Sequence, residues 1–381
     1  MTSTTDSTTP DPSASGPTTP GSTTNTPTSD DAASQSRHTA DAEQQPRSRM
    51  RLVITTILWW LHGAVRALLA AALLVYGASK LGLGQFGMAD MGDSLIAFGE
   101  MSPMGLLWRM VAYSPLFQVL AGLAEVGAAL ALLWRRTALI GALLAIADMA
   151  FVVVLNLGYD VPVKQLSTAL LVMGAIVLLP WIPRLVRSLL SHGEVGRGPV
   201  PTLVPWRPLA HITDVLGPIT AVVLIAVGSW MISSQLHAPT QNNATPAGVW
   251  SVASDTAKPA AQLSEDERWQ KVAFGNQEGS FGARVQVRLA NGELKEGRYE
   301  RTSPTTITVE LHDQRVEGQT VQDWMESPAQ ELTLTVDEQT DGTLHITGDG
   351  VDLVLAPDES GRLLHDRGFS WSPRPDDPFN R

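Results

Sequence analysis

Residues 66–86 read RALLAAALLVYGASKLGLGQF, an apolar run that opens on an arginine and closes on Gly-x-x-Lys followed by Gln-Phe. It belongs to a longer apolar stretch, at about 52–78, that has the length of a membrane-spanning helix. A charge inside such a segment is costly unless it has a partner or a task. The number of such stretches therefore decides the fold class, and the positions of their charges indicate where a function lies.

Five stretches of this chain are long and apolar enough to cross a bilayer, and in lipid only helices or closed barrels satisfy their own backbone. We expect five transmembrane helices, at about 52–78, 115–134, 137–157, 166–186 and 208–235. The short flanking segments hold ten Lys and Arg residues on one side and three on the other. By the positive-inside rule, the N-terminus is cytoplasmic, and the odd number of spans puts the C-terminal region outside.

The chain divides into six segments by composition. The first is rich in Ser, Thr and Pro, has almost no large apolar side chain and lacks the form of a signal peptide, so we expect it to be disordered. The expected segments are a cytoplasmic leader at 1–47, a four-helix transmembrane bundle at 48–190, a cytoplasmic loop at 191–207, a fifth helix at 208–235, a linker at 236–246 and an extracytoplasmic β domain at 247–381.

The last segment has the alternation of apolar and polar residues that is typical of strands, with Asn-Gly and Asp-Gly turns between them. Clear examples are ARVQVRL (283–289), TTITVEL (305–311), ELTLTV (331–336) and VDLVLA (351–356). About eight short strands predict a small antiparallel barrel or sandwich. Its opening, GVWSV (248–252), is similar to the Gly-x-Trp start of lipocalin-like barrels, although a strand Trp is more often plain core.

Composition and missing motifs exclude several functions. The net charge is -11, and all of the excess lies after residue 235, with 24 acidic and 13 basic residues, so nucleic acid is not an expected partner. The chain has no cysteine, which excludes thiol chemistry and disulfides of its own. It contains no nucleotide-binding or hydrolase motif, and its eight His residues show no metal spacing. We therefore predict no catalytic residue and no metal site.

Three neighbouring spans each place one ionisable residue near their centre: Arg66, Glu125 and Asp148. Pairing is the economical state for charges at this depth, and we expect Arg66 to pair with Glu125. His62, one helical turn before Arg66, lies on the same helix face and extends this intramembrane polar cluster. The cluster is either an ion pair that fixes helix register or a pocket for the head group of a lipid or quinone.

Small residues beside these charges, such as Gly122 and Gly141, predict a tightly packed bundle rather than a wide pore. Four further polar residues are expected at the outer membrane face: Lys80, Gln85, Asp160 and Lys164. There a lysine reaches the interface at low cost. Asp160 and Lys164 are four residues apart, and a local pair between them is favoured over a contact of Asp160 with Lys80.

Motifs in the first three spans are shared with a known family: they are R-x(10)-G-x-x-K (66–80), GLAEVGAALALLWRRT (122–137) and NLGYDVPVK (156–164). Through them the chain resembles the DoxX family of bacterial membrane proteins. The stretches MSPMGLLWRM (101–110), RGFSW (367–371) and PFNR (378–381) are similar to those of a longer subgroup that joins a DoxX-like bundle to an extracytoplasmic β domain. The resemblance implies a DoxX-like four-helix bundle plus a fifth helix in a bacterial plasma (inner) membrane.

The same resemblance implies a function, because the family is named for a membrane subunit of a thiosulfate:quinone oxidoreductase. We expect an accessory rather than catalytic subunit of a membrane redox complex, quinone-linked or linked to oxidative stress, with the lipid bilayer and a redox subunit as partners and a quinone or lipid as ligand. The alternative is a scaffold or a protein that binds lipid or a small ligand through its β-barrel, with purely structural buried charges. A sealed ion pair and a hollow barrel favour that alternative.

Overall fold

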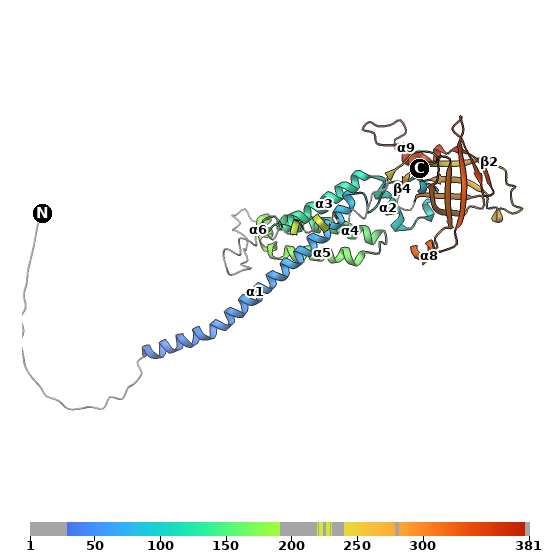
Figure 1. The fold of residues 1–381 in the computed structure, drawn as a ribbon. Coiled ribbons are helices and arrows are strands. Elements are labelled where there is room, and N and C mark those ends of the chain that lie inside the picture. Colours follow the sequence, from blue (N-terminus) through green and yellow to red (C-terminus); the bar gives the residue numbers. More distant parts are fainter. Residues whose placement is uncertain are drawn as a thin grey trace, which may run out of the picture. The chain divides into compact units, whose positions relative to one another are not determined.

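The fold is taken from a computed structural model that describes residues 29–190, 219, 221–223, 226–228, 230, 240–278 and 282–377. Within these residues a helical bundle precedes a β-barrel (Figure 1). Most of the expected fifth span, 208–235, lies outside the described residues, as do the loop 191–207 and the terminal stretch 378–381. The described pieces of that span, 221–223 and 226–228, are helical.

Four helical segments of the described residues are long and apolar enough to cross a membrane: Met50–Leu81, Pro115–Leu133, Ala138–Gly158 and Lys164–Leu190. They confirm the first four expected spans. The helices that form them are α1 (Ser29–Leu81), α3 (Pro115–Leu133), α4 (Ala138–Gly158), and α5 (Lys164–Leu178) continued by η3 (Leu179–Trp181) and α6 (Ile182–Leu190). A shorter helix, α2 (Pro103–Tyr113), lies between the first two spans.

Helix α1 begins at Ser29, so the part of the expected disordered leader from residue 29 to 47 is helical. The expectation rested on the lack of apolar side chains to bury. Ala, Glu, Gln and Arg, which are frequent between 32 and 49, are all good helix formers and extend the apolar span toward the N-terminus.

Two Ser-Pro pairs set the boundaries of α2 and α3. The Ser102 side chain accepts a hydrogen bond from the Gly105 amide, and the Ser114 side chain accepts one from the Phe117 amide. Proline follows each serine at the first helical position, where its missing N–H has no intrahelical partner to lose. These caps start the short helix α2 between the first two spans and fix the turn at which α2 ends and α3 begins.

The bundle packs through small and apolar side chains. Its core cluster includes Leu69, Leu73, Ala128, Ala142 and Met149, and its wider set of neighbours includes Ala221 and Val222 of the expected fifth span. Helices α3, α4 and α5 lie side by side in Figure 1. Their remaining faces expose large apolar residues, among them Leu116, Ile140, Val154 and Leu157, as expected for helices that face lipid.

The β domain is a closed barrel of eight antiparallel strands, in the order β10-β2-β3-β5-β6-β7-β8-β9. The strands are β2 (Gly248–Asp255), β3 (Trp269–Phe274), β5 (Ala283–Leu289), β6 (Leu294–Arg301), β7 (Thr306–Asp313), β8 (Gln330–Glu338), β9 (Leu344–Gly348) and β10 (Val351–Pro357). Of the two predicted architectures, the barrel is confirmed. The short helix α8 (Val321–Met325) connects β7 to β8, and α9 (Leu363–Asp366) follows β10.

The predicted Asn-Gly and Asp-Gly turns join neighbouring strands of the barrel. Gly292, Gly342 and Gly350 have φ angles of +90°, +81° and +81°, which a side chain would strain. Upstream of β2, Thr240 and Gln241 form a two-residue strand, β1 (Thr240–Gln241), paired with β4 (Gln277–Glu278). The end of the expected linker is therefore attached to the barrel.

The barrel interior is filled. Eighteen buried side chains form one apolar cluster, with Phe274, Val309, Leu334, Ile346 and Leu355 fully inaccessible. Eight strands enclose a space that side chains are just large enough to fill. Trp250 packs against this cluster and donates its indole N–H to the Pro246 carbonyl, 2.9 Å away, which agrees with the structural interpretation of the Gly-x-Trp stretch.

Candidate functional site in the helical bundle

Two glycines allow α1 and α3 to approach closely near the end of the first span. A Cβ atom on Gly77 would lie 2.9 Å from the Gly122 carbonyl oxygen, and one on Gly122 would lie 2.8 Å from the Gly77 carbonyl oxygen. No larger residue fits either position without a shift of backbone. This crossing brings Lys80, one turn after Gly77, against Glu125, one turn after Gly122.

Lys80 and Glu125 form a buried ion pair. The ammonium Nζ lies 2.5 and 2.7 Å from the two carboxylate oxygens, and the residues are 8% and 1% exposed. Side chains of a helix point toward its N-terminus, so Lys80 at the end of α1 is directed back into the bundle rather than out to the interface. The structure thus buries Lys80 against Glu125, where the sequence analysis expected it to reach the interface.

The expected pair between Arg66 and Glu125 is wrong, since Lys80 binds both oxygens of the Glu125 carboxylate. Arg66 is half-buried on α1, fourteen residues or almost four turns before Lys80. His62 Nε2 lies 3.0 Å from the Val177 carbonyl oxygen of α5, a local contact between two helices. Neither residue lines the cavity described next.

A cavity of about 110 Å³ lies beside the ion pair. Its apolar wall comes from α1, α2, α3, α4 and α5 and from the turns that follow α1 and α4. Aromatic side chains contribute much of that wall: Tyr76, Phe86, Trp108, Phe117 and Phe151. The polar part of the lining consists of Lys80, Gln85, Gln118, Glu125, Asp148, Asn156 and Ser167. The predicted Glu125 and Asp148 thus share one site, with Lys80 and Gln85 in place of Arg66 and His62.

Asp148 is the polar residue of this site with a buried atom that has no hydrogen-bond partner. Its Oδ2 atom is buried and makes no hydrogen bond in the described part of the chain. The carboxylate interacts electrostatically with Lys80 and with Glu125. With two carboxylates and one ammonium, the site has an excess negative charge unless it also holds a proton. A buried acceptor without a donor costs free energy, so Asp148 is the position where a ligand's hydroxyl or N–H group would be stabilised.

The sequence analysis missed three polar residues of the cavity, all of which hold the wall in place. Gln118 is fully buried and donates to the Gly87 carbonyl oxygen at 3.0 Å. Asn156 donates to the Ser167 hydroxyl at 2.9 Å. A signal was present, because Gln118 precedes Glu125 by seven residues and Asn156 follows Asp148 by eight. These are two helical turns, which put each pair on one face.

The remaining predicted residues lie at the edge of the site or outside it. Gln85 accepts a hydrogen bond from the Ser79 hydroxyl at 3.2 Å and lines the cavity. Asp160 and Lys164 form the expected local pair, and neither lines the cavity. Among the residues that the structure describes, no group of three His, Asp or Glu side chains is placed to hold a metal ion.

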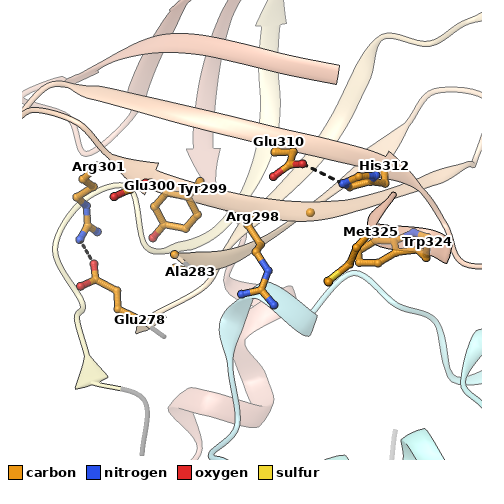
Figure 2. Close-up of a pocket in the computed structure, with 12 residues that line it drawn as sticks. Glu278, Ala283, Arg298, Tyr299, Glu300, Arg301, Glu310, His312, Trp324 and Met325 are labelled. Carbon is orange, nitrogen blue, oxygen red and sulfur yellow. Dashed lines mark hydrogen bonds and ion pairs between the residues drawn. The ribbon is translucent and has the colours of Figure 1, made fainter. Parts of the chain in front are cut away.

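A second hollow, of about 740 Å³, lies on the barrel (Figure 2). Its charged residues are largely matched within the barrel itself: Arg301 lies 2.7 Å from Glu278, and the His312 ring nitrogen lies 3.3 Å from Glu310. Tyr299 belongs to the buried cluster, and burial raises its pKa to about 12. Among the described residues, a buried polar atom without a hydrogen-bond partner lines the bundle cavity, at Asp148, and none lines this hollow, so the bundle cavity remains the candidate site.

Comparison with known proteins finds a relative of this chain. Over 119 residues it is 34% identical to the uncharacterized protein YwoB of Bacillus subtilis (strain 168), a match that covers 31% of this chain and 74% of that protein. The chain belongs to the YwoB family. Since YwoB is itself uncharacterized, the YwoB family brings no activity to the site. No family model matches the chain, and no solved structure matches it.

Proposed function

We propose that the chain is a DoxX-like accessory membrane protein whose bundle holds the polar end of a small amphiphile, a quinol or a lipid, for a membrane redox complex. The observation that carries the proposal is the partnerless Oδ2 atom of Asp148 in an aromatic-walled cavity. Aromatic and apolar walls with a few convergent polar groups are typical of small-molecule sites. A bound quinol would supply two-electron redox chemistry, and a hydroxyl on it would meet Asp148.

The size of the cavity limits what it can take without moving. A cavity of about 150 Å³ holds a benzene ring, so the 110 Å³ of this cavity suits part of a head group or a few water molecules. A whole quinone ring needs the wall to open. The apolar tail of such a ligand would leave between the lipid-facing helices.

The alternative function, with purely structural charges, also has an observation in its favour. The Lys80–Glu125 pair satisfies itself, and such pairs fix helix register without binding anything. The barrel form of the alternative has less support, because the barrel interior is filled with side chains rather than hollow. Asp148 separates the two functions, since it is outside the pair and inside the cavity.

The test is native mass spectrometry of the full chain, purified from its own membrane, with extraction and identification of bound lipids and quinones. We expect a retained amphiphile in the natural protein, strong loss in Asp148→Asn, and no loss in the matched control Asp160→Asn, whose carboxylate lies outside the cavity. A redox subunit in the same spectrum would support the accessory role. A bare natural protein, or equal occupancy in all three, overturns the proposal.

For the topology we infer a cytoplasmic N-terminus and an extracytoplasmic barrel. Four spans leave residue 190 at the opposite end of the bundle from residue 81, whereas the barrel contacts the segment just after residue 81. Ala221 and Val222, from the expected fifth span, pack against the bundle core. Alkaline phosphatase, which needs an oxidising compartment, should be active when fused after residue 377 and inactive when fused after residue 190. The reverse pattern would reverse the orientation.

A further inference from the structure

The segment between α1 and α3 contributes residues from both of its ends to the wall of the bundle cavity. We call residues 82–113 the cap. Its first part contributes Phe86 to the cavity wall, and α2 contributes Leu107, Trp108 and Val111. The rings of Phe86 and Trp108 are in contact, with centroids 4.9 Å apart. The two ends of the cap thus meet in the cavity wall.

The middle of the cap is held by the barrel. It contains two short turns, η1 (Met91–Asp93) and η2 (Phe98–Glu100). Arg284 of β5 lies 2.8 Å from Asp93, and Arg288 of the same strand lies 2.7 Å from Glu100. The hydrogen bond from Arg288 lowers the pKa of Glu100, which keeps this contact charged at neutral pH.

Backbone hydrogen bonds add a second layer to the contact. The Asn276 amide donates to Asp90 Oδ1 at 2.9 Å, and the Leu95 amide donates to the Gln286 side chain at 3.1 Å. The contact is also close, since a Cβ atom on Gly92 would lie 2.8 Å from the Arg284 Cβ. The cap is therefore docked on the outer wall of the barrel through specific groups rather than through loose surface charges.

Asp93 joins this docking to the cavity wall. Besides Arg284 of the barrel, it lies 3.4 Å from Arg109 of α2. Arg109 directly follows Trp108, one of the two rings that close the cavity. A movement of the barrel away from the cap would break the contact of Asp93 with Arg284 and weaken the support of the helix that carries Trp108.

We propose that the barrel is a clamp that controls access to the bundle cavity: docked on the cap it holds Phe86 and Trp108 closed, and undocked it lets a ligand enter or leave on that side. The biological purpose of the clamp, control of ligand access, rests on the proposed function. Its mechanics are independent of any ligand. It also supplies the opening that a whole head group requires.

The absence of cysteine makes the clamp directly testable. Ser167→Cys places one small thiol in the cavity wall, at a residue that is 4% exposed. Its rate of modification by a small, water-soluble methanethiosulfonate reports access to the cavity in the full chain. We expect the combination of Arg284→Glu and Arg288→Glu to increase this rate about tenfold or more. Each reversal replaces an attractive pair by two like charges, and the free-energy cost of the two reversals exceeds that of one factor of ten.

Matched variants separate an open cap from a damaged fold. Arg268→Glu reverses an arginine whose partner, Asp266, lies within the barrel, and should leave the rate unchanged. Arg288→Glu alone should increase the rate, and addition of Glu100→Arg should lower it again by restoring an opposite pair. Ala129→Cys, a fully buried position outside the cavity, should stay unreactive throughout.

An unchanged rate at residue 167 after the double reversal overturns the clamp, as does equal acceleration at residue 129, because the contact then holds the whole bundle together. A failure of the clamp is distinguishable from a failure of the proposed function. If the labelling rate depends on the docking pairs but no amphiphile is retained, the clamp stands and the proposed function fails. If an amphiphile is retained but the labelling rate does not depend on the docking pairs, the proposed function stands and the clamp fails.

Discussion

The barrel and the bundle distribute apolar and charged side chains in opposite ways. The barrel encloses eighteen apolar side chains and pairs charges such as Lys295 with Asp313 on its accessible parts. The bundle exposes large apolar residues such as Leu116 and Val154 and keeps Lys80 and Glu125 inside. Each region thus matches a different solvent. On the barrel, charges cost little free energy and form the contacts with the cap. In the bundle, buried charges cost more free energy and mark the candidate site.

The largest effect is expected where the bundle holds its charges. Glu125→Gln removes the hydrogen-bonded counter-charge of the buried Lys80, which should cost about 3–5 kcal/mol of the free energy of unfolding. Thermal unfolding of the full chain in detergent measures this. The double replacement Lys80→Met with Glu125→Leu should recover most of the loss, because an apolar pair replaces a buried ion pair at little cost. A Glu125→Gln protein as stable as the natural one would contradict the buried pair.

In the barrel, removal of a buried apolar side chain should lower the free energy of unfolding by a similar or slightly smaller amount. Phe274 is fully inaccessible in the barrel interior, so Phe274→Ala should cost about 3–5 kcal/mol by removing contacts and leaving a cavity. Region-resolved hydrogen exchange should show the change in the strands and not in α3 or α4. Trp371→Ala, at a side chain that is 92% exposed, is the matched control and should stay within about 0.5 kcal/mol.

The glycine crossing of the bundle should give an intermediate effect. Gly122→Ala places a Cβ against the Gly77 backbone and should cost about 1–3 kcal/mol through overpacking. Gly127→Ala, on the same helix with open space around it, should be neutral or stabilise by roughly 0.5–1 kcal/mol through its better helix propensity. Equal effects of the two changes in thermal unfolding would contradict the close approach of α1 and α3.

The smallest effect is a pH dependence confined to the barrel. Burial alone would raise the pKa of Asp358, but hydrogen bonds from Lys271, Ser360 and Gly361 outweigh it and hold that pKa well below its usual range. The stabilisation is therefore complete above the unfolded-state pKa, about 4, and is lost as the pH falls below it. Hydrogen exchange of β2 and β3 at pH values on both sides of 4 should show this loss, and Asp358→Asn should reduce it. An unchanged slope in that variant would assign the acid sensitivity elsewhere.

The sequence by itself determined the membrane class, the positions of four spans and the β character of the C-terminal region, because hydrocarbon length and strand alternation are local patterns. It also determined that Glu125 and Asp148 belong together, since both lie at the middle of neighbouring spans. Local spacing was enough for the Asp160–Lys164 pair as well, which joins residues four positions apart at the turn between α4 and α5.

The tertiary structure decided what those patterns leave open. Arg66 and Lys80 are both cations on the first span, and depth along the sequence favours Arg66 as the partner of Glu125. The glycine crossing and the tilt of side chains toward the helix N-terminus select Lys80 instead. The docking of Arg284 and Arg288 on the cap joins residues nearly two hundred positions apart, and no local pattern contains such a contact.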